Sequence, residues 1–269
     1  MNIFYFTGTG NCLAIAKELA NEFENCKIVP ICKNNIKITS QIVYGDVGII
    51  FPVYFRGIPL IVKEFIKKIK INQDSHVFAI ATYGGSYGTP ISILENMLLK
   101  KGVKLSAAYK LLMPSNHQTI HDPISKEKQY DRIQIQKEQL AQIAKSIKNK
   151  DVVKVKEKGI LFTIFINNYI LTTKRIHNLD KNFWTDEKCN GCGTCSRVCP
   201  ANNIEMLEKT PKWQHRCESC LACMQWCPRQ SIQYKKNTIE RGRYHHPEIK
   251  VNELFQKIAD KNLDMNTKN

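Results

Sequence analysis

Two short runs of cysteines constrain this 269-residue chain more than any other feature of its sequence. The first run, CNGCGTCSRVCP, covers residues 189–200, and the second, CESCLACMQWCP, covers residues 217–228. In each run, two residues separate the first three cysteines from one another, three more precede the fourth, and a proline closes the run. Each cysteine of the second run lies 28 residues after its counterpart in the first run, and Ile232 lies 28 residues after Ile204 in the same way. Eight thiols in two matching sets predict two matching metal centres.

This spacing is typical of bacterial two-cluster iron–sulfur proteins, in which the fourth cysteine of each run binds the cluster of the other run. It predicts one 4Fe–4S cluster on Cys189, Cys192, Cys195 and Cys227, and a second on Cys199, Cys217, Cys220 and Cys223. A pair of zinc sites is one alternative, but zinc ribbons usually place two CxxC pairs a dozen or more residues apart. A disulfide framework is the other, and it suits short secreted chains.

Charge and hydropathy limit the partners and the compartment. The net charge is +16 and the pI about 9.3, which favours acidic partners, so we expect a redox protein partner such as an acidic electron carrier. The lysines are scattered and not interleaved with aromatic residues, so we expect no nucleic acid partner. The apolar run at 159–173 is shorter than the roughly 20 residues of a membrane span. With no signal peptide pattern at the N-terminus, we expect a cytoplasmic protein without a membrane span.

The first 150 residues alternate between apolar runs and amphipathic segments. We expect strands at 2–6, 27–31, 46–54, 76–83 and 104–113, and helices at 11–24, 59–69, 90–101 and 125–148. Such alternation predicts a parallel sheet with helices on both faces. Ligands of these sheets bind outside the carboxyl ends of the strands.

Polar, glycine and tyrosine residues gather in the loops after the first, third and fourth strands. The candidate binding residues are Thr7, Gly8, Thr9, Gly10, Asn11, Cys12, Pro52, Val53, Tyr54, Phe55, Gly57, Thr82, Tyr83, Gly84, Gly85, Tyr87 and Gly88. The first loop brings backbone N–H groups to a helix N-terminus, which suits a phosphate. It is neither a Walker loop nor a GxGxxG loop. The tyrosines of the other loops suit a flat ring, and Asn116, His117 and His121 follow the fifth strand at the same edge.

The segment FTGTGN at 6–11 looks like the phosphate loop of flavodoxins. Joined to the two cysteine runs, nearly the whole chain resembles the flavodoxin–ferredoxin fusion family. The resemblance implies an α/β fold, a flavodoxin-like doubly wound parallel five-stranded sheet of order 2-1-3-4-5, with a small α+β bacterial ferredoxin-like 2×4Fe–4S domain. It also implies non-covalent FMN, with the phosphate on Thr7, Thr9, Gly10 and Asn11 and the isoalloxazine between Tyr54 and Tyr83 or Tyr87.

Cys12 departs from this resemblance, because flavodoxins usually end the phosphate loop with Ser or Thr. A thiol is a weak hydrogen-bond donor, so we expect weaker binding of the phosphate. At a helix N-terminus the thiol would have a lowered pKa and react readily. We expect the simpler alternative, in which Cys12 is a small, half-buried residue without chemistry.

The resemblance divides the chain into an FMN-binding domain at 1–150, a linker or helix at 151–183, an iron–sulfur domain at 184–236 and a tail with an amphipathic helix at 237–269. It implies an electron-transfer protein of anaerobic metabolism that moves single electrons between the clusters and FMN. Two alternatives stay open: an FMN-dependent reductase of a small molecule fed by the clusters, and a scaffold or sensor with structural clusters. The sequence has no added NAD site and no evident acid–base pair, which favours an electron carrier over an enzyme and predicts no catalytic residue.

Overall fold

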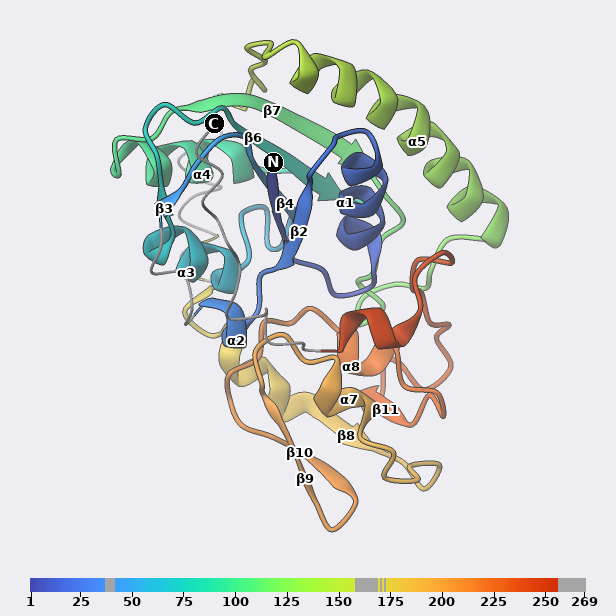
Figure 1. Ribbon diagram of the computed structural model, residues 1–269. Helices are drawn as coiled ribbons and strands as arrows, with labels where there is room; N and C mark the ends of the chain where they lie inside the picture. The colour runs from blue at the N-terminus through green and yellow to red at the C-terminus, as the bar shows by residue number, and fades with distance from the viewer. Residues whose placement is uncertain (37–41, 158–168, 170, 172, 256–269) are drawn as a thin grey trace.

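The computed structural model describes residues 1–36, 42–157, 169, 171 and 173–255. A parallel sheet of order β2-β1-β4-β6-β7 forms the first part of the chain (Figure 1). Its strands are β1 (Asn2–Tyr5), β2 (Lys27–Pro30), β4 (Val47–Pro52), β6 (Val77–Tyr83) and β7 (Leu105–Leu112). Numbered by the five expected strands, this order is 2-1-3-4-5, so the predicted flavodoxin-like fold class is confirmed.

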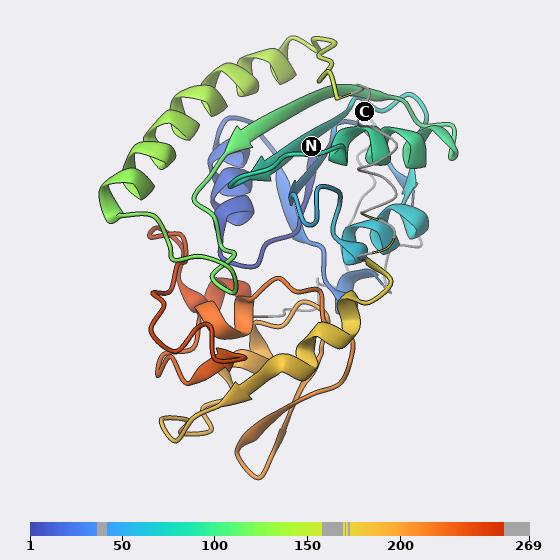
Figure 2. The same cartoon turned by 180° about the vertical axis from the view of Figure 1, so that it is seen from behind.

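Helices cover both faces of the sheet. Helices α1 (Asn11–Asn21) and α5 (Lys126–Lys148) lie on one face, and α3 (Leu60–Lys68) and α4 (Pro90–Leu99) on the other (Figures 1 and 2). The central strands are buried on both faces, as the continuous apolar run of β4 requires; Ile49, Ile50 and Phe51 are wholly buried. Each helix turns an apolar stripe onto this layer. We call the part from β1 to α5 the sheet module.

Three short elements of the sheet module were not expected from the sequence. They are α2 (Lys33–Ile36) and the strands β3 (Ile42–Val43) and β5 (Lys70–Ile71), which pair with each other in parallel. Elements of two to four residues hold only about one period of the hydrophobic pattern of a helix or strand, so the pattern does not repeat within them. Sequence periodicity therefore carries no signal for them.

The second part, from β8 to β11, is called the cysteine module here. Its strands pair in two antiparallel ribbons, β8 (Phe183–Thr185) with β11 (Ile232–Tyr234), and β9 (Ile204–Leu207) with β10 (Thr210–Trp213). Two short helices, α7 (Thr194–Arg197) and α8 (Ala222–Gln225), occupy equivalent places in the two cysteine runs. This symmetry gives the module one core of its own, around Met224 and Ile232.

The cysteine module packs against the edge of the sheet module from which the carboxyl ends of the strands emerge (Figures 1 and 2). Residues of the second half-repeat, Cys220, Ala222 and Trp226, belong to the same buried cluster as the strands of the sheet. The chain then returns to the sheet module through residues 244–255, which we call the closing segment. Leu254 is buried there, and Lys17 forms an ion pair with Glu253 at 2.6 Å.

Two expected features lie wholly or largely outside the described residues. The apolar run at 159–173 is one; of its described residues, Tyr169 donates a hydrogen bond from its hydroxyl to the carbonyl oxygen of Ile58 at 2.7 Å. The amphipathic tail helix is the other. Its described part is a single 3-10 turn, η2 (Val251–Leu254), and residues 256–269 are not described. No helix within the described ranges is long and apolar enough to cross a membrane.

The tight contact of the two modules makes Gly8 sensitive to substitution. A Cβ atom at Gly8 would lie 2.4 Å from the backbone oxygen of Cys220. We therefore expect Gly8→Ala to lower the free energy of unfolding by about 1–3 kcal/mol, because backbone on both sides must shift. Gly85→Ala is the matched control, since no atom lies within 4 Å of a Cβ there. Thermal unfolding followed by circular dichroism measures both variants, and equal stabilities would contradict the tight contact.

Candidate functional site

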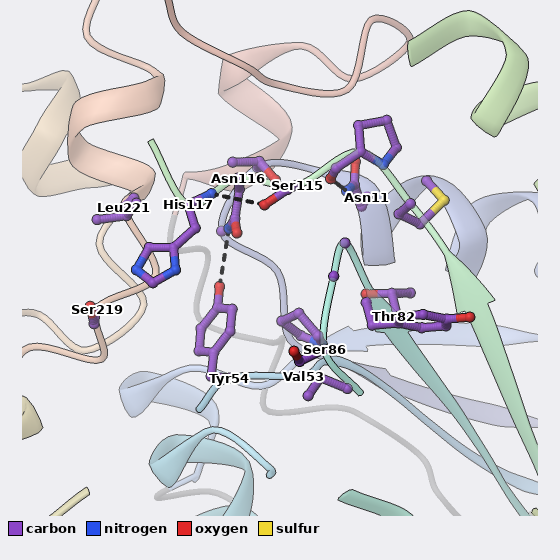
Figure 3. Close-up of a pocket in the computed structure, with 18 of the residues that line it drawn as sticks. Asn11, Val53, Tyr54, Thr82, Ser86, Ser115, Asn116, His117, Ser219 and Leu221 are labelled. Atoms are coloured by element: carbon purple, nitrogen blue, oxygen red, sulfur yellow. Dashed lines mark hydrogen bonds between the residues drawn. The ribbon is translucent and has the colours of Figure 1, made fainter. Parts of the chain in front are cut away.

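A cavity of about 380 Å³ opens where the loops after β1, β4, β6 and β7 meet the cysteine module (Figure 3). Most of the predicted binding residues line it: Thr7, Gly8, Thr9, Asn11, Cys12, Pro52, Val53, Tyr54, Phe55, Thr82, Tyr83, Gly84 and Gly85. The cavity therefore lies at the edge where parallel sheets bind ligands.

The loop after β1 has the geometry of an anion cradle. Gly10 adopts a φ of +95°, and its N–H group donates to the hydroxyl of Thr7 at 3.0 Å. Among the described residues, the N–H groups of Gly8, Thr9 and Asn11 have no hydrogen-bond partner. Unpaired N–H groups at the N-terminus of an eleven-residue helix attract a phosphate, so the loop fits the phosphate group of FMN.

Two residues that follow this loop, Asn11 and Cys12, are held in place by their surroundings. The amide of Asn11 is engaged at both atoms, because its nitrogen donates to the carbonyl oxygen of Pro114 at 3.1 Å and its oxygen accepts the Tyr244 hydroxyl at 2.6 Å. Cys12 is 1% exposed, and its sulfur lies 3.3 Å from the hydroxyl oxygen of Thr82. Burial raises the pKa of the Cys12 thiol to about 12. The thiol is thus a packed, protonated group and not an activated nucleophile.

The loop after β4 makes a tight turn under Tyr54. Tyr54 and Gly57 exchange two backbone hydrogen bonds, and the intervening Phe55 and Arg56 have φ values of +50° and +64°. Non-glycine residues rarely adopt this conformation, and they concentrate at binding sites. The Tyr54 hydroxyl faces the side-chain nitrogen of Asn116 at 3.5 Å (Figure 3). Burial, with Cys220 nearby, raises the pKa of Tyr54 well above its ordinary value, so the ring is a neutral wall of the cavity.

Four predicted binding residues do not line the cavity. Gly10 faces His246 and Ile249, Gly57 faces the ring of Tyr169, and Gly88 faces Arg56. Tyr87 stands behind Tyr83, with the two rings edge to face at 5.1 Å. Of the two alternatives for the second stacking ring, the structure places Tyr83 at the cavity.

The cavity also has lining residues that sequence reasoning did not include in the site: Arg56, Ser86, Met113, Pro114, Ser115, Ile120, Ser219 and Leu221. The last two come from inside the second cysteine run. They adopt φ values of +53° and +61°, while Gly191 and Gly193 take this conformation at the equivalent positions of the first run. The first run has glycines at these two positions and the second run has residues with side chains. This difference is the sequence signal that the second run is the one that faces the sheet module.

Each predicted ligand set lines its own small cavity. One is lined by Cys189, Cys192, Cys195 and Cys227, with Ile232, and we call it cavity I. The other is lined by Cys199, Cys217, Cys220 and Cys223, with Ile204, and we call it cavity II. Each cavity thus combines three cysteines of one run with the fourth cysteine of the other, as two 4Fe–4S clusters need. Within the described part of the chain, no three His, Cys, Asp or Glu side chains converge closely enough to hold a single metal ion.

The two cysteine cavities differ in their exposure. All four cysteines of cavity II are at most 9% exposed, whereas Cys192 of cavity I is exposed and Cys189 and Cys227 are half-buried. Backbone N–H groups reach the sulfurs of cavity II: that of Asn203 lies 3.2 Å from the sulfur of Cys199, and that of Ser219 lies 3.2 Å from the sulfur of Cys217. Hydrogen bonds to ligand sulfurs and burial are two of the features through which a protein sets a cluster's potential.

Glu218 ties cavity II to the sheet module. Its carboxylate accepts the N–H group of Ile61, in the first turn of α3, at 2.9 Å. The side chain is 6% exposed, and burial raises its pKa to about 7. At the preceding residue, a ring nitrogen of His177 lies 2.9 Å from the carbonyl oxygen of Cys217. The second run is therefore anchored at two neighbouring residues, Cys217 and Glu218.

Comparison with known families identifies the cysteine module. Residues 188–230 match the 4Fe-4S dicluster domain, which confirms the prediction of two 4Fe–4S clusters. An uncharacterized protein of Methanocaldococcus jannaschii is 42% identical over 38 residues, which are 14% of this chain and 11% of that protein. The chain thus spans only about a tenth of that relative's length.

Several solved structures are similar to part of this chain. Rubredoxin oxygen:oxidoreductase from Desulfovibrio gigas is 18% identical over 55% of this chain and 36% of its own, with a TM-score of 0.36. The two-electron reduced flavodoxin of Megasphaera elsdenii is 17% identical over 40% of this chain and 83% of its own, with a TM-score of 0.33. Azoreductase from Bacillus anthracis is 11% identical over 54% of this chain and 98% of its own, with a TM-score of 0.35. These likenesses are weak, and the fold rests on the strand order itself. The family match agrees with the two expected 4Fe–4S clusters, and the expectation of FMN rests on the residues that line the cavity.

The burial of Cys12 predicts an unreactive thiol. Its pKa of about 12 means that about one thiol in ten thousand is ionised at pH 8, and the thiolate is the species that reacts. We expect iodoacetamide at pH 8 to leave Cys12 unmodified in the folded protein while the half-buried Cys26 is alkylated. Peptide mass spectrometry measures both sites. Alkylation of Cys12 ahead of Cys26 would mean that the helix N-terminus, and not burial, sets the pKa.

Proposed function

We propose that this chain is an electron-transfer protein in which FMN in the 380 Å³ cavity and two 4Fe–4S clusters form one path for electrons. FMN-binding and iron–sulfur domains at 1–150 and 184–236 would supply the two parts. The observation that carries the proposal is the shared wall: Ser219 and Leu221, which flank Cys220, line the cavity of the sheet module. When bound, FMN exchanges two electrons and each cluster exchanges one.

The residues between the cavities support an order of the cofactors. Cavity II lies directly behind the flavin cavity, because Leu221 lines both. The side-chain nitrogen of Asn116 lies 3.4 Å from the carbonyl oxygen of Cys220 and 3.5 Å from the Tyr54 hydroxyl. These partly buried contacts hold the flavin site and the second cluster site at a fixed separation. In our proposal the second cluster therefore neighbours the flavin and the first cluster is the outer one.

The surface around cavity I supports an acidic protein as the outer partner. Arg197 is exposed and its guanidinium lies 3.4 Å from the carbonyl oxygen of Cys192. Lys209 lies directly over Gly191, and Lys188 and Arg229 are exposed next to ligand positions. Basic groups around an exposed cluster edge steer an acidic electron carrier toward it. We propose such a carrier as the partner. Its reduction potential, relative to that of the outer cluster, would decide the direction of electron flow.

Removing one ligand of the outer cluster tests this order. We expect Cys192→Ser to lose most of the flavin reduction that a reduced ferredoxin supports in stopped-flow absorption, because its electrons enter through the cluster of cavity I. Cys26→Ser, the same substitution at a cysteine outside both cavities, is the control and keeps the rate.

Two results would contradict the proposal. Unchanged flavin reduction in Cys192→Ser would mean that electrons reach the flavin without the outer cluster. Saturable turnover with a single small-molecule acceptor would instead support an FMN-dependent reductase fed by the clusters.

A further inference from the structure

The carbonyl groups of the loop after β1 are bound by residues from distant parts of the chain. The carbonyl oxygen of Gly8 accepts the indole N–H of Trp226 at 2.9 Å. The carbonyl oxygen of Thr9 accepts the backbone N–H of His246 at 2.8 Å. Trp226 lies between two ligand positions of the second cysteine run, and His246 belongs to the closing segment. The loop is thus held on its carbonyl side by the cysteine module and the segment that follows it.

A second chain of hydrogen bonds, mostly buried, reaches the same loop through Tyr244. The Tyr244 hydroxyl donates to the side-chain oxygen of Asn11 at 2.6 Å, and Tyr244 is 1% exposed. Its backbone N–H donates to the side-chain oxygen of Gln225 at 2.9 Å, and the nitrogen of that amide donates to the carbonyl oxygen of Asn116 at 2.9 Å. Helix α8 of the cysteine module is thereby connected to both Asn11 and the loop after β7.

These contacts fix the direction in which the loop's N–H groups point. A peptide unit is planar and trans, so its C=O and N–H bonds point in opposite directions. When Trp226 holds the carbonyl of Gly8, the N–H of Thr9 is aimed away from Trp226. Thr9 lines the flavin cavity, and its N–H has no partner among the described residues. A donor aimed before the ligand arrives binds it without the cost of ordering the loop.

We infer that Trp226 and Tyr244 are positioning residues of the flavin phosphate loop, so that the iron–sulfur module forms part of the binding site for the FMN phosphate. This inference rests on the proposed function and adds a second role for the second cysteine run. In this role the run brings a cluster near the flavin and also holds the loop that binds the flavin's phosphate. Flavin affinity then depends on side chains more than 200 residues away from that loop in the sequence.

Removal of single hydrogen-bond donors tests the inference in the cluster-loaded protein. Trp226→Phe removes the indole N–H and keeps an aromatic ring against His245, whose ring stacks on it at 4.3 Å. We expect the Kd for FMN, measured by quenching of flavin fluorescence, to rise about 3- to 10-fold. The control is Trp184→Phe, which removes an indole N–H from the carbonyl of Lys235 in the same module and leaves the Kd unchanged.

Tyr244→Phe provides an independent second variant. It removes the donor to Asn11, and we expect a rise in the Kd for FMN of the same size, about 3- to 10-fold. Tyr109→Phe is its control, because that hydroxyl donates to Ser146 at 2.9 Å away from the flavin cavity. Iron content stays at the level of the unmodified protein in all four variants, since none of them removes a cysteine.

Riboflavin, which lacks the phosphate, separates positioning of the phosphate loop from a general structural role. We expect Trp226→Phe and Tyr244→Phe to leave the Kd for riboflavin unchanged, so the preference for FMN over riboflavin falls 3- to 10-fold, as the loss of one hydrogen bond implies (about 1 kcal/mol). Equal weakening for both flavins, or no weakening of FMN in either variant, would overturn the inference alone. An unmodified protein that binds neither flavin would overturn the proposed function itself.

Discussion

The close approach of the loop after β1 to the second cysteine run is the constraint on which the rest of the structure depends. The backbone of Gly8 lies so near the carbonyl of Cys220 that no side chain fits between them. Trp226 seals this contact with a hydrogen bond to the carbonyl of Gly8. Through this contact the second cysteine run forms one wall of the flavin cavity, and the second half-repeat joins the core of the sheet. The contact also sets the distance between a flavin site and a cluster site.

The two halves of the cysteine repeat have acquired different surroundings from nearly the same backbone. Gly191 and Gly193 keep the first run free of side chains at its two left-handed positions, and its cavity opens toward solvent. Ser219 and Leu221 occupy these positions in the second run despite the strain that a side chain brings there. The side chain of Leu221 is 2% exposed, so the packing it gains against the sheet module offsets that strain. One symmetric motif thereby presents an outer and an inner cluster site.

The sequence was sufficient for the features that rest on a repeated pattern. Alternating apolar runs predicted the five strands and four helices of the sheet module, and the resemblance to flavodoxins implied the order of the strands. The cysteine spacing predicted the two ligand sets, each of which lines a cavity of its own. It was not sufficient for the wall between the modules. Ser219 and Leu221 lie between about 100 and about 210 residues from the loops they meet, and no local period relates them. Gly10 and Gly57 were assigned to the cavity because of their residue type, but they make room for His246 and Tyr169 instead.

Cys12 shows why residue type alone does not decide chemistry. At a helix N-terminus a thiol is expected to ionise easily, but the same residue in a buried position is expected to stay protonated. The structure decides between these two expectations, because Cys12 is buried next to Thr82 and burial raises the pKa of its thiol. In the same way, Trp226 is one aromatic residue among many in the sequence, and only its hydrogen bond to the carbonyl of Gly8 connects it to the loop that lines the cavity.

Iron and flavin content per chain after strictly anaerobic purification tests the central claim most directly. Two clusters and a flavin in one protein predict about eight irons and about one FMN. About eight irons with no flavin, even after FMN is added, would contradict the claim and leave an iron–sulfur protein with an empty sheet module. Zinc in place of iron would contradict it at the cysteine cavities.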